Sequence, residues 1–402
     1  MRPISTGNNR FDAVVVGGGP AGSSAARVLA ANGMNVCVVD KSIFPRDKLC
    51  GGLLTLRSKK VFNDIFANDW GSTIEAVATG ISFYYQSRCL NVIHDYTELY
   101  FTCRREFDAF LLRLAAEQGA KLLQGSPVTH VNVAECTLRL ADGTTLAGNY
   151  VIGADGVNSV VARSLFGESF DRRRTAFALE MEIPVSGIRS PAQVPEIHFG
   201  VVPWGYGWVF PKKSTLTAGI GGLHKKNPHL RPRFEEFLRH RFGILPPGKI
   251  MGHYIPFGGC RQIPGQGNVL LCGDAAGLVE PITGEGIAFA MLSGKYAAQA
   301  VLGAAKHRCP QLALDFYLTE YSRITNAFAC SNALRFFLLP KSAQGLLLKL
   351  LLRTQSIPRK FLDLLADKLG HAEYTRFLLG KVLCGLLRPV LPIPLGDDRR
   401  SG

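Results

Sequence analysis

The chain has 402 residues, of which 47% are hydrophobic, and its 46 Lys and Arg against 31 Asp and Glu give a formal net charge of +15. A chain this long and apolar can bury a sizeable core, which excludes a disordered protein and indicates two domains or one large composite domain. The positive charge favours anionic partners, such as nucleotide phosphates, nucleic acid or acidic lipid head groups, without choosing among them.

Ten cysteines are scattered along the chain without a C-x-x-C pair. Neither a zinc site nor an iron–sulfur ligand set is visible, so we expect no metal and reduced thiols in the cytoplasm. Residues 1–10 carry no apolar signal core, and no uncharged apolar run reaches 18 residues. We therefore expect a cytoplasmic protein that is not exported and does not span a membrane.

A short apolar strand over 11–16 runs directly into a G-x-G-x-x-G sequence, Gly17-Gly18-Gly19-Pro20-Ala21-Gly22. A helical pattern over 23–32 follows, and a second strand over 35–39 ends at Asp40, 18 positions beyond the last glycine. A strand before the glycines, a helix after them and an acidic residue at this distance are typical of a dinucleotide-binding βαβ unit.

The residues of this unit have separate roles in binding a dinucleotide. Gly17 allows the tight turn, Gly19 lets the backbone approach a pyrophosphate, and Gly22 lets helix and strand pack closely. The N-terminus of the helix offers free N–H groups to the phosphates. Asp40 is expected to accept hydrogen bonds from the hydroxyls of the adenosine ribose.

Residues 44–52 are too polar and glycine-rich for a strand and are expected to form a loop that lies against a planar ring. Within it, Cys50 is either a packing cysteine or a thiol held beside a flavin. Beyond the loop, we expect a helix near 54–66 and strands near 79–85 and 90–94.

Arg104 opens an amphipathic helix with apolar residues at helical spacing from Phe107 to Ala115. A cation is disfavoured at a helix N-terminus, so the position of Arg104 predicts a nearby anion. Short strands near 121–124 and at Val128, and a strand pair around a turn at 141–144, then lead to Gly153-Ala154-Asp155-Gly156.

Tyr206, Trp208 and Phe210 alternate at period two, so in an extended strand all three point to the same face. Pro211 ends the strand, a polar turn follows, and residues 215–221 return as a second strand whose small residues leave room for something flat. An isolated aromatic strand usually forms an ordinary core hairpin. The flanking motifs favour a different interpretation, the wall of an apolar substrate pocket.

A third motif begins at the apolar strand 269–272, which delivers Gly273 and Asp274 at its carboxyl end. Residues 281–286 then lead into a long alanine-rich helix, 287–305. The aspartate can bind a sugar-like hydroxyl, and the helix N-terminus can stabilise negative charge on a reduced ring.

The chain resembles the FAD-dependent flavoproteins of the aromatic-hydroxylase type in four motifs: GGGPAG, Arg104 with Phe107-Asp108, GADG at 153–156, and GD at 273–274. Within that group it looks like the geranylgeranyl reductase family, because of two longer motifs. These are Pro45-Arg46-x-Lys48-x-Cys50-Gly51-Gly52, and Tyr206-x-Trp208-x-Phe210-Pro211 followed by seven residues and Gly219-x-Gly221.

The resemblance, which covers roughly residues 10–310, implies an α/β fold: a Rossmann-type FAD-binding domain, an inserted antiparallel β-sheet substrate domain and C-terminal helices. We expect a discontinuous FAD-binding domain over 10–60, 100–165 and 255–310. The substrate-binding sheet is expected over 61–99 and 166–254, and a helical region over 311–402.

The resemblance also implies non-covalent FAD and reduction of isolated carbon–carbon double bonds in a prenyl chain held beside the flavin. Positions that match the family's FAD contacts are Ala21, Asp40, Cys50, Gly51, Arg104, Val128, Asp274, Gly286 and Ile287. The motifs add further expected cofactor-binding residues: Gly17, Gly19, Pro20, Gly22, Asp155 and Gly273. The positions that match its substrate motif are Tyr206, Trp208 and Phe210.

A prenyl chain has no polar handle, so binding depends on burial of apolar area, at about 25 cal/mol per Å². Reduction requires a hydride from the reduced flavin on one alkene carbon and a proton on the other. We take Cys50 and Tyr206 as candidate catalytic proton donors, beside an ordered water. NAD(P)H or reduced ferredoxin is the expected electron donor, because no second dinucleotide fingerprint is visible.

Residues 331–402 contain 12 Lys and Arg against 5 Asp and Glu, interleaved with leucine-rich segments such as 345–352. We expect short helices with apolar faces and basic edges. Three roles stay open for them: a cap on the substrate tunnel, peripheral contact with an anionic membrane surface, and ordinary packing against the FAD-binding domain.

Other classes share some of these features. A flavin monooxygenase shares the FAD motifs, but a halogenase would need W-x-W-x-I-P, which is missing. A quinone-linked dehydrogenase would need cysteine-ligated iron–sulfur chemistry, and Cys384 is the one cysteine beyond residue 330. We expect no nucleic-acid partner, because the charge is dispersed. The prenyl substrate stays open among a diphosphate, a membrane lipid, a quinone tail and a chlorophyll side chain.

Overall fold

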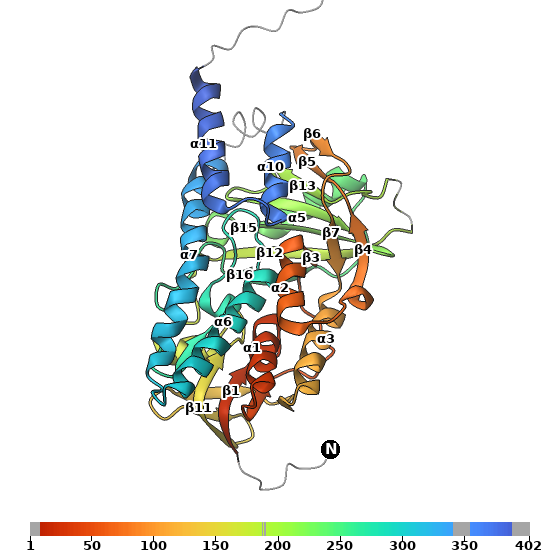
Figure 1. Cartoon of the computed structure of the whole chain (residues 1–402). Coiled ribbons are helices and arrows are strands. Elements are labelled where there is room, and N and C mark those ends of the chain that lie inside the picture. The colour runs from red at the N-terminus through yellow and green to blue at the C-terminus, as the bar shows by residue number, and fades with distance from the viewer. Residues whose placement is uncertain (1–8, 187, 189, 341–353, 388–402) are drawn as a thin grey trace, which may run out of the picture.

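The computed structural model describes residues 9–186, 188, 190–340 and 354–387. Two large sheets, one small sheet and the helices around them form an elongated molecule (Figure 1). The first sheet lies at the bottom of the view with α1 and α6, and the second lies above it. Helices α10 (Ser356–Leu365) and α11 (His371–Leu387) are at the top of the view, with α10 near the strands β5 and β6.

The first sheet has a parallel centre with the order β17-β18-β11-β1-β2-β8, in which only β17 is antiparallel to its neighbour. Strands β9 and β10 extend it beside β11 as antiparallel neighbours. Its strands are β1 (Arg10–Val16), β2 (Val36–Val39), β8 (Lys121–Leu123), β9 (Val128–Asn132), β10 (Thr137–Leu140), β11 (Thr145–Gly153), β17 (Gly265–Gln266) and β18 (Val269–Leu271).

The helices that accompany this sheet are α1 (Pro20–Ala31), α3 (Arg104–Glu117), α4 (Val160–Phe166), α6 (Ile287–Lys306) and α7 (Leu312–Leu338). Helices α1 and α6 pack so closely at Gly294 that a Cβ there would lie 2.1 Å from the carbonyl oxygen of Ala21. The core between sheet and helices joins the buried strands β1, β2 and β18 to the alanine-rich face of α6.

The second sheet has the order β16-β12-β15-β14-β13-β5-β6, and all its pairs are antiparallel except β13 with β5. Its strands are β5 (Ile81–Tyr85), β6 (Arg88–Ile93), β12 (Ala176–Pro184), β13 (Glu196–Phe199), β14 (Gly205–Pro211), β15 (Thr215–Leu223) and β16 (Met251–Ile255). Helix α5 (Leu230–Phe242) packs on β12 and β15.

A small sheet and one helix lie between these parts. The small sheet has the order β3-β7-β4, formed by β3 (Leu53–Leu54), β4 (Ile74–Ala78) and β7 (Leu99–Thr102). Helix α2 (Leu56–Phe66) follows β3, and the hydroxyl of Thr55 accepts a hydrogen bond from the Ser58 N–H at its start. Three single turns complete the chain: Gly71–Thr73, His224–Lys226 and Gly273–Ala276.

The strand expected near 79–85 is confirmed as β5 (Ile81–Tyr85), which begins slightly later than expected. The chain forms β4 in the small sheet, turns at Thr79 and Gly80, and continues as β5 in the second sheet. A Cβ at Gly80 would lie 2.1 Å from the carbonyl oxygen of Ile93, so only glycine fits where the chain changes sheets. The strand period continues through this change, which is why the pattern did not show it.

The C-terminal helices pack on one another and on the second sheet. Helix α11 contacts α7, and α10 contacts α11 and β6. The leucine-rich segment 345–352 lies outside the described residues. Among the helices that the structure describes, none is long and apolar enough to cross a bilayer.

Candidate functional site

The loop 44–52 lies between the glycine-rich turn and the aromatic strand β14. At one end, the ring of Phe44 is 3.1 Å from where a Cβ on Gly18 would be. At the other, a Cβ on Gly51 would lie 2.8 Å from the Phe210 ring and 3.3 Å from Nε1 of Trp208. The loop predicted to lie against a planar ring therefore joins the two predicted halves of the site.

The glycine-rich turn brings three chain segments into contact. Gly17 has φ +104°, and a Cβ there would lie 2.4 Å from the carbonyl oxygen of Ala154. A Cβ on Gly22 would lie 1.8 Å from the carbonyl oxygen of Gly17, so helix α1 meets β1 only because both positions are glycine. Helix α1 then begins at Pro20 without a side-chain cap, which leaves its first N–H groups for a ligand.

These features fit a bound dinucleotide. A Cβ on Gly19 would meet only the Arg46 guanidinium, 3.6 Å away, so the backbone there is open to a close approach. Nη1 of Arg46 is buried and has no hydrogen-bond partner within the described part of the chain. A buried guanidinium N–H without an acceptor, next to an uncapped helix N-terminus, suits the pyrophosphate of FAD.

Asp40 lies where the motif requires but is already hydrogen-bonded. Its Oδ2 accepts from the Gly18 N–H (2.7 Å) and its Oδ1 from the Ser42 N–H (2.8 Å). Each carboxylate oxygen retains a further lone pair for a sugar hydroxyl. The carboxylate thus holds the glycine-rich turn in shape, and its contact with the ribose remains a prediction.

The anion predicted beside Arg104 is Asp108, one helical turn away on α3. Nε and Nη2 of Arg104 donate to Oδ1 and Oδ2 of Asp108 at 2.6 and 2.7 Å, and Nη2 of Arg46 donates to Oδ2 at 2.9 Å. Asp108 is fully buried. Burial opposes the charged form of Arg104, and Asp108 overcomes this effect, so the pKa of the guanidinium is raised.

Two other predicted cofactor residues are found at the ends of elements. The carboxylate of Asp155 accepts hydrogen bonds from the Ser159 hydroxyl (2.5 Å) and the Val160 N–H (2.6 Å), and so holds the start of α4. A contact of Asp155 with FAD remains a prediction. Val128 is the first residue of β9.

The third motif meets the first at α6. Gly273 has φ +58°, and a Cβ there would lie 3.0 Å from the Cβ of Ala21. Gly286 precedes α6, which begins at Ile287 without a side-chain cap, and a Cβ on Gly286 would lie 3.8 Å from Oδ1 of Asp274. Asp274 and the uncapped start of α6 therefore lie side by side, as the binding of a sugar and a reduced ring requires.

The aromatic strand explains the small residues opposite it differently from our expectation. A Cβ on Gly219 would lie 2.3 Å from Cζ2 of Trp208, and one on Gly221 3.4 Å from Cζ3. The flat group for which these glycines leave room is the indole of Trp208 itself. The sequence predicted room for something flat, and the side chain of the cross-strand neighbour fills that room.

Glu180 is a residue of the site that the sequence analysis missed. Its Oε2 accepts from Nε1 of Trp208 (3.3 Å) and its Oε1 from the Cys50 N–H (3.2 Å), so one carboxyl group joins the two family motifs. Its side chain is 6% exposed, and burial raises its pKa to about 7. The sequence pattern that could have identified Glu180 is a glutamate at an inward-facing position of an otherwise apolar strand.

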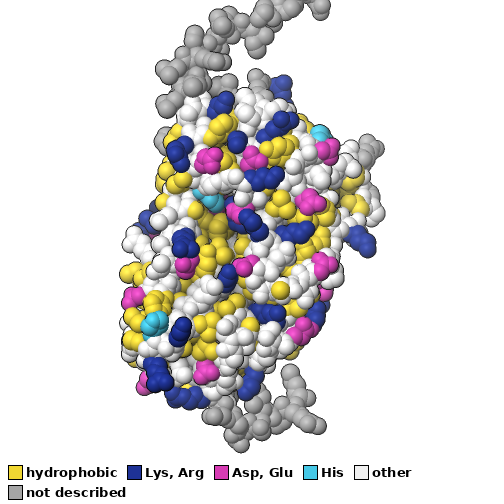
Figure 2. Space-filling model, viewed as in Figure 1, with side chains coloured by type: hydrophobic (Ala, Val, Ile, Leu, Met, Phe, Trp, Pro, Cys, Tyr) yellow, Lys and Arg dark blue, Asp and Glu magenta, His cyan; other side chains and the backbone are white. Residues whose placement is uncertain are grey.

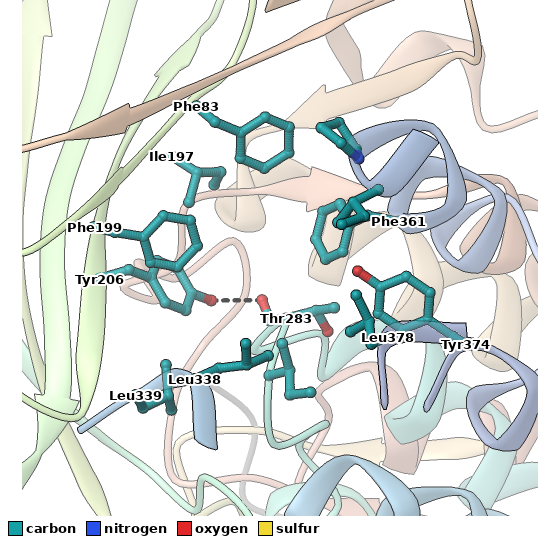
Figure 3. A pocket seen from close by; sticks show the side chains of 13 residues that line it. Phe83, Ile197, Phe199, Tyr206, Thr283, Leu338, Leu339, Phe361, Tyr374 and Leu378 are labelled. Atoms are coloured by element: carbon teal, nitrogen blue, oxygen red, sulfur yellow. Dashed lines mark hydrogen bonds between the residues drawn. The ribbon is translucent and has the colours of Figure 1, made fainter. Parts of the chain in front are cut away.

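An apolar pocket of about 680 Å³ lies beside Tyr206, between the second sheet and the C-terminal helices (Figure 3). Side chains from β5, β13 and β14 form one wall, and α10 and α11 form the opposite wall. The pocket is lined by Phe83, Ile197, Phe199, Tyr206, Ile282, Thr283, Leu338, Leu339, Ile357, Pro358, Phe361, Tyr374 and Leu378. Trp208 and Phe210 are 8% and 7% exposed and lie outside this lining.

The loop before α6 closes one side of the pocket. The Tyr206 hydroxyl donates to the carbonyl oxygen of Thr283 at 2.5 Å (Figure 3), and the Thr283 hydroxyl donates to Glu280 at 2.8 Å. Burial raises the pKa of Tyr206, so its hydroxyl keeps its proton at neutral pH. On the other side of the loop, Glu285 pairs with Arg57 of α2.

The comparisons with known proteins agree with this geometry. A family model described as an FAD binding domain matches residues 10–201. An uncharacterised protein of Methanosarcina barkeri is 34% identical over 301 residues, which cover 74% of this chain and 76% of that protein. The menaquinone reductase of Mycolicibacterium smegmatis is 31% identical over 326 residues, with 73% and 76% covered.

The chloroplastic geranylgeranyl diphosphate reductase of Arabidopsis thaliana is 31% identical over 330 residues, covering 75% of this chain and 67% of that protein. This chain belongs to the geranylgeranyl reductase family of FAD-dependent oxidoreductases. Its cofactor is FAD.

A solved structure shows the same fold for this geranylgeranyl reductase family member. The crystal structure of a geranylgeranyl bacteriochlorophyll reductase-like protein from Thermoplasma acidophilum has a TM-score of 0.75 at 23% identity. The match covers 94% of this chain and 96% of that one. The predicted α/β class, with a Rossmann-type sheet, a second antiparallel sheet and C-terminal helices, is confirmed.

Proposed function

We propose that this protein reduces carbon–carbon double bonds of a prenyl chain, and that the pocket beside Tyr206 holds that chain. The observation that carries the proposal is the character of the pocket wall. Among its lining residues in the described part of the chain none is charged, and polar side-chain groups come only from Tyr206, Thr283 and Tyr374.

Such a wall suits a hydrocarbon chain energetically. Burial contributes about 0.8 kcal/mol per CH₂, so an isoprene unit of five carbons gains about 4 kcal/mol. A diphosphate in the same space would lose its hydration without any cation to replace it. A substrate with a charged or large head group would therefore insert its apolar end and leave its head outside the pocket.

Reduced FAD, when bound, supplies a hydride to one alkene carbon. The other carbon needs a proton, and Tyr206 and Cys50 are our candidate donors from this chain. Tyr206 holds its hydroxyl at the pocket wall through Thr283, and the Cys50 thiol accepts a hydrogen bond from the Gly52 N–H at 3.4 Å. The apolar walls keep water from this region.

The names of the relatives favour two substrate types: a prenyl diphosphate or chlorophyll-like molecule, and a quinone with a prenyl tail. We propose NAD(P)H or reduced ferredoxin as the electron donor. We also propose a cytoplasmic enzyme with peripheral membrane contact through its basic C-terminal region. No nucleic-acid partner is proposed: on the face in Figure 2, Lys and Arg side chains are spread among Asp and Glu side chains.

The test uses the FAD-loaded protein, reduced without oxygen and incubated with geranylgeranyl diphosphate or with a menaquinone. A mass gain in steps of two hydrogens supports the proposal. For the quinone, the gain must persist after reoxidation in air, because only saturation of the tail survives that step. In a parallel incubation to which air is admitted, oxygenated products would instead support a monooxygenase, which shares the FAD motifs.

Two neighbouring leucines of α11 provide a matched pair of variants. Leu378 is 2% exposed and lines the pocket, whereas Leu379 is 40% exposed. Leu378→Trp is expected to fill the pocket and lower kcat/KM at least about tenfold, which equals 1.4 kcal/mol of lost binding, while FAD content is retained. Leu379→Trp should behave as the unchanged protein. Full activity of Leu378→Trp would show that the chain binds elsewhere.

A further inference from the structure

Three cations of the family motifs, Arg46, Lys48 and Arg104, lie near the predicted FAD site and bond to Asp108 of α3 and His253 of β16. Arg46 and Arg104 share the carboxylate of Asp108, the one carboxylate within ion-pair distance of either among the described residues. Lys48 has no carboxylate within that distance in the same part of the chain. The cluster of Arg46, Lys48 and Arg104 thus carries a formal excess of two positive charges.

Lys48 is partnered by a group that cannot neutralise it. Its Nζ is hydrogen-bonded to Nε2 of His253, on β16 of the second sheet. An ammonium group can only donate, so this imidazole nitrogen accepts and the ring is neutral. Burial, followed by the charges of Lys48 and Arg104, lowers the pKa of His253 to about 3, which agrees with a neutral ring.

The charge of Lys48 is costly where it lies. Burial lowers its pKa to about 8, against an opposing effect of Asp274 at the start of α6. A buried ammonium without a carboxylate in contact is stabilised further when an anion binds beside it. The neighbours of Lys48 in sequence and space show which crevice it faces: Arg46 at the glycine-rich turn, Cys50 beside Trp208, and Asp274.

We propose that Lys48 is the counter-ion of reduced FAD, and that it stabilises the anionic reduced ring over the oxidised one. Reduction by a two-electron donor, such as a reduced nicotinamide or dithionite, places two electrons and one proton on the ring and leaves it with one negative charge. Lys48 keeps its three protons and pairs with that charge. Transfer of the hydride to a substrate returns the ring to neutrality and ends the pairing.

The inference rests on FAD binding and not on the identity of the substrate. An interaction made only with the reduced state must change the ratio of the two FAD affinities, and hence the midpoint potential. Loss of the Lys48 charge is expected to weaken binding of reduced FAD relative to oxidised FAD about tenfold. For a two-electron couple, this ratio corresponds to a midpoint potential lower by about 30 mV.

The experiment is an anaerobic reductive titration of the FAD-loaded protein against a redox dye, at low ionic strength and neutral pH. Lys48→Met should lower the potential by about 30 mV, and Lys48→Arg, which keeps the charge, should restore most of it. Lys60→Met is the matched control, because Lys60 is 70% exposed and pairs with Asp367 at the surface. A Lys48→Met protein with the unchanged potential would overturn the proposal.

The proposal can still be tested if Lys48→Met is purified with less bound FAD than the unchanged protein. Apoprotein is then titrated with oxidised and with reduced FAD: a preferential loss of the reduced form supports the proposal, and an equal loss refutes it. If Lys48→Met does not fold, Lys48→Gln takes its place with the same two outcomes. If the potential shifts but the protein reduces no prenyl chain, only the proposed function is refuted. If the protein reduces a prenyl chain but the potential does not shift, only this inference is refuted.

Discussion

The carboxyl group of Glu180 should make the stability of this protein depend on pH in an unusual direction. Its pKa is raised from 4.5 to about 7, mainly by burial, with Lys212 opposing the rise. Below pH 4.5 the group is protonated in both the folded and the unfolded chain. As the pH rises through 7 the folded state must accept a buried charge, so the stability that the neutral group provided is lost.

The size of the effect follows from the two pKa values. A rise of about 2.5 pKa units corresponds to about 3 kcal/mol at 1.36 kcal/mol per unit. An unfolding entropy of about 2.1 cal/mol/K per residue gives about 0.8 kcal/mol/K for 402 residues. If the chain unfolds as one unit, the loss of stability corresponds to about 4 °C in Tm.

The assay compares Tm of the FAD-loaded protein with that of Glu180→Gln at pH 5 and pH 8. Glutamine does not ionise, so the Tm of the variant relative to the unchanged protein should rise by about 3 °C between these pH values, because part of the loss has already occurred at pH 5. Any constant cost of placing an amide beside Trp208 cancels in this difference. An equal Tm gap at both pH values would refute the argument.

Glu182 is the matched control for this prediction. It lies two residues along the same strand and on the same face, but its side chain is 47% exposed and accepts hydrogen bonds from Lys212, Thr215 and Thr217. Its pKa is lowered: burial opposes the charged form, and the charge and hydrogen bond of Lys212 outweigh that effect. The stability that the ionised group provides is lost only as the pH falls below about 4.5, its ordinary pKa, so Glu182→Gln should leave the Tm gap nearly unchanged between pH 5 and pH 8.

Two further substitutions test the packing that forms the site. Gly219→Ala would place a Cβ 2.3 Å from Trp208 and should lower the stability of the protein, measured through Tm, by about 1–3 kcal/mol. Gly370→Ala is the control: its Cβ would have no atom within 4 Å, so it should change the stability by less than about 0.5 kcal/mol. Equal effects of the two substitutions would contradict the close packing at Gly219. Arg57→Met leaves Glu285, whose side chain is 6% exposed, as an unpaired buried charge and should cost about 3–5 kcal/mol. The double variant Arg57→Met/Glu285→Gln should recover part of that loss in Tm, and no recovery would show that the ion pair is not the cause.

Short-range patterns in the sequence determined the parts of the site that lie on single elements. The glycine spacing at 17–22 predicted the turn into α1, because a Cβ on Gly17 or on Gly22 would collide with a backbone carbonyl oxygen. Period-two spacing predicted that Tyr206, Trp208 and Phe210 share one face of β14, and their adjacent rings lie 6.2 and 6.5 Å apart. The anion beside Arg104 was predicted as well, and its i,i+4 spacing to Asp108 could have named it.

The tertiary structure alone decided how these elements meet. The flat group opposite Gly219 is a side chain of the neighbouring strand, and the carboxyl group that joins Cys50 to Trp208 comes from Glu180, 130 residues after Cys50. The second wall of the pocket comes from α10 and α11, far along the chain from the aromatic strand. Local spacing cannot show such contacts, because each depends on which distant apolar faces bury one another when the chain folds.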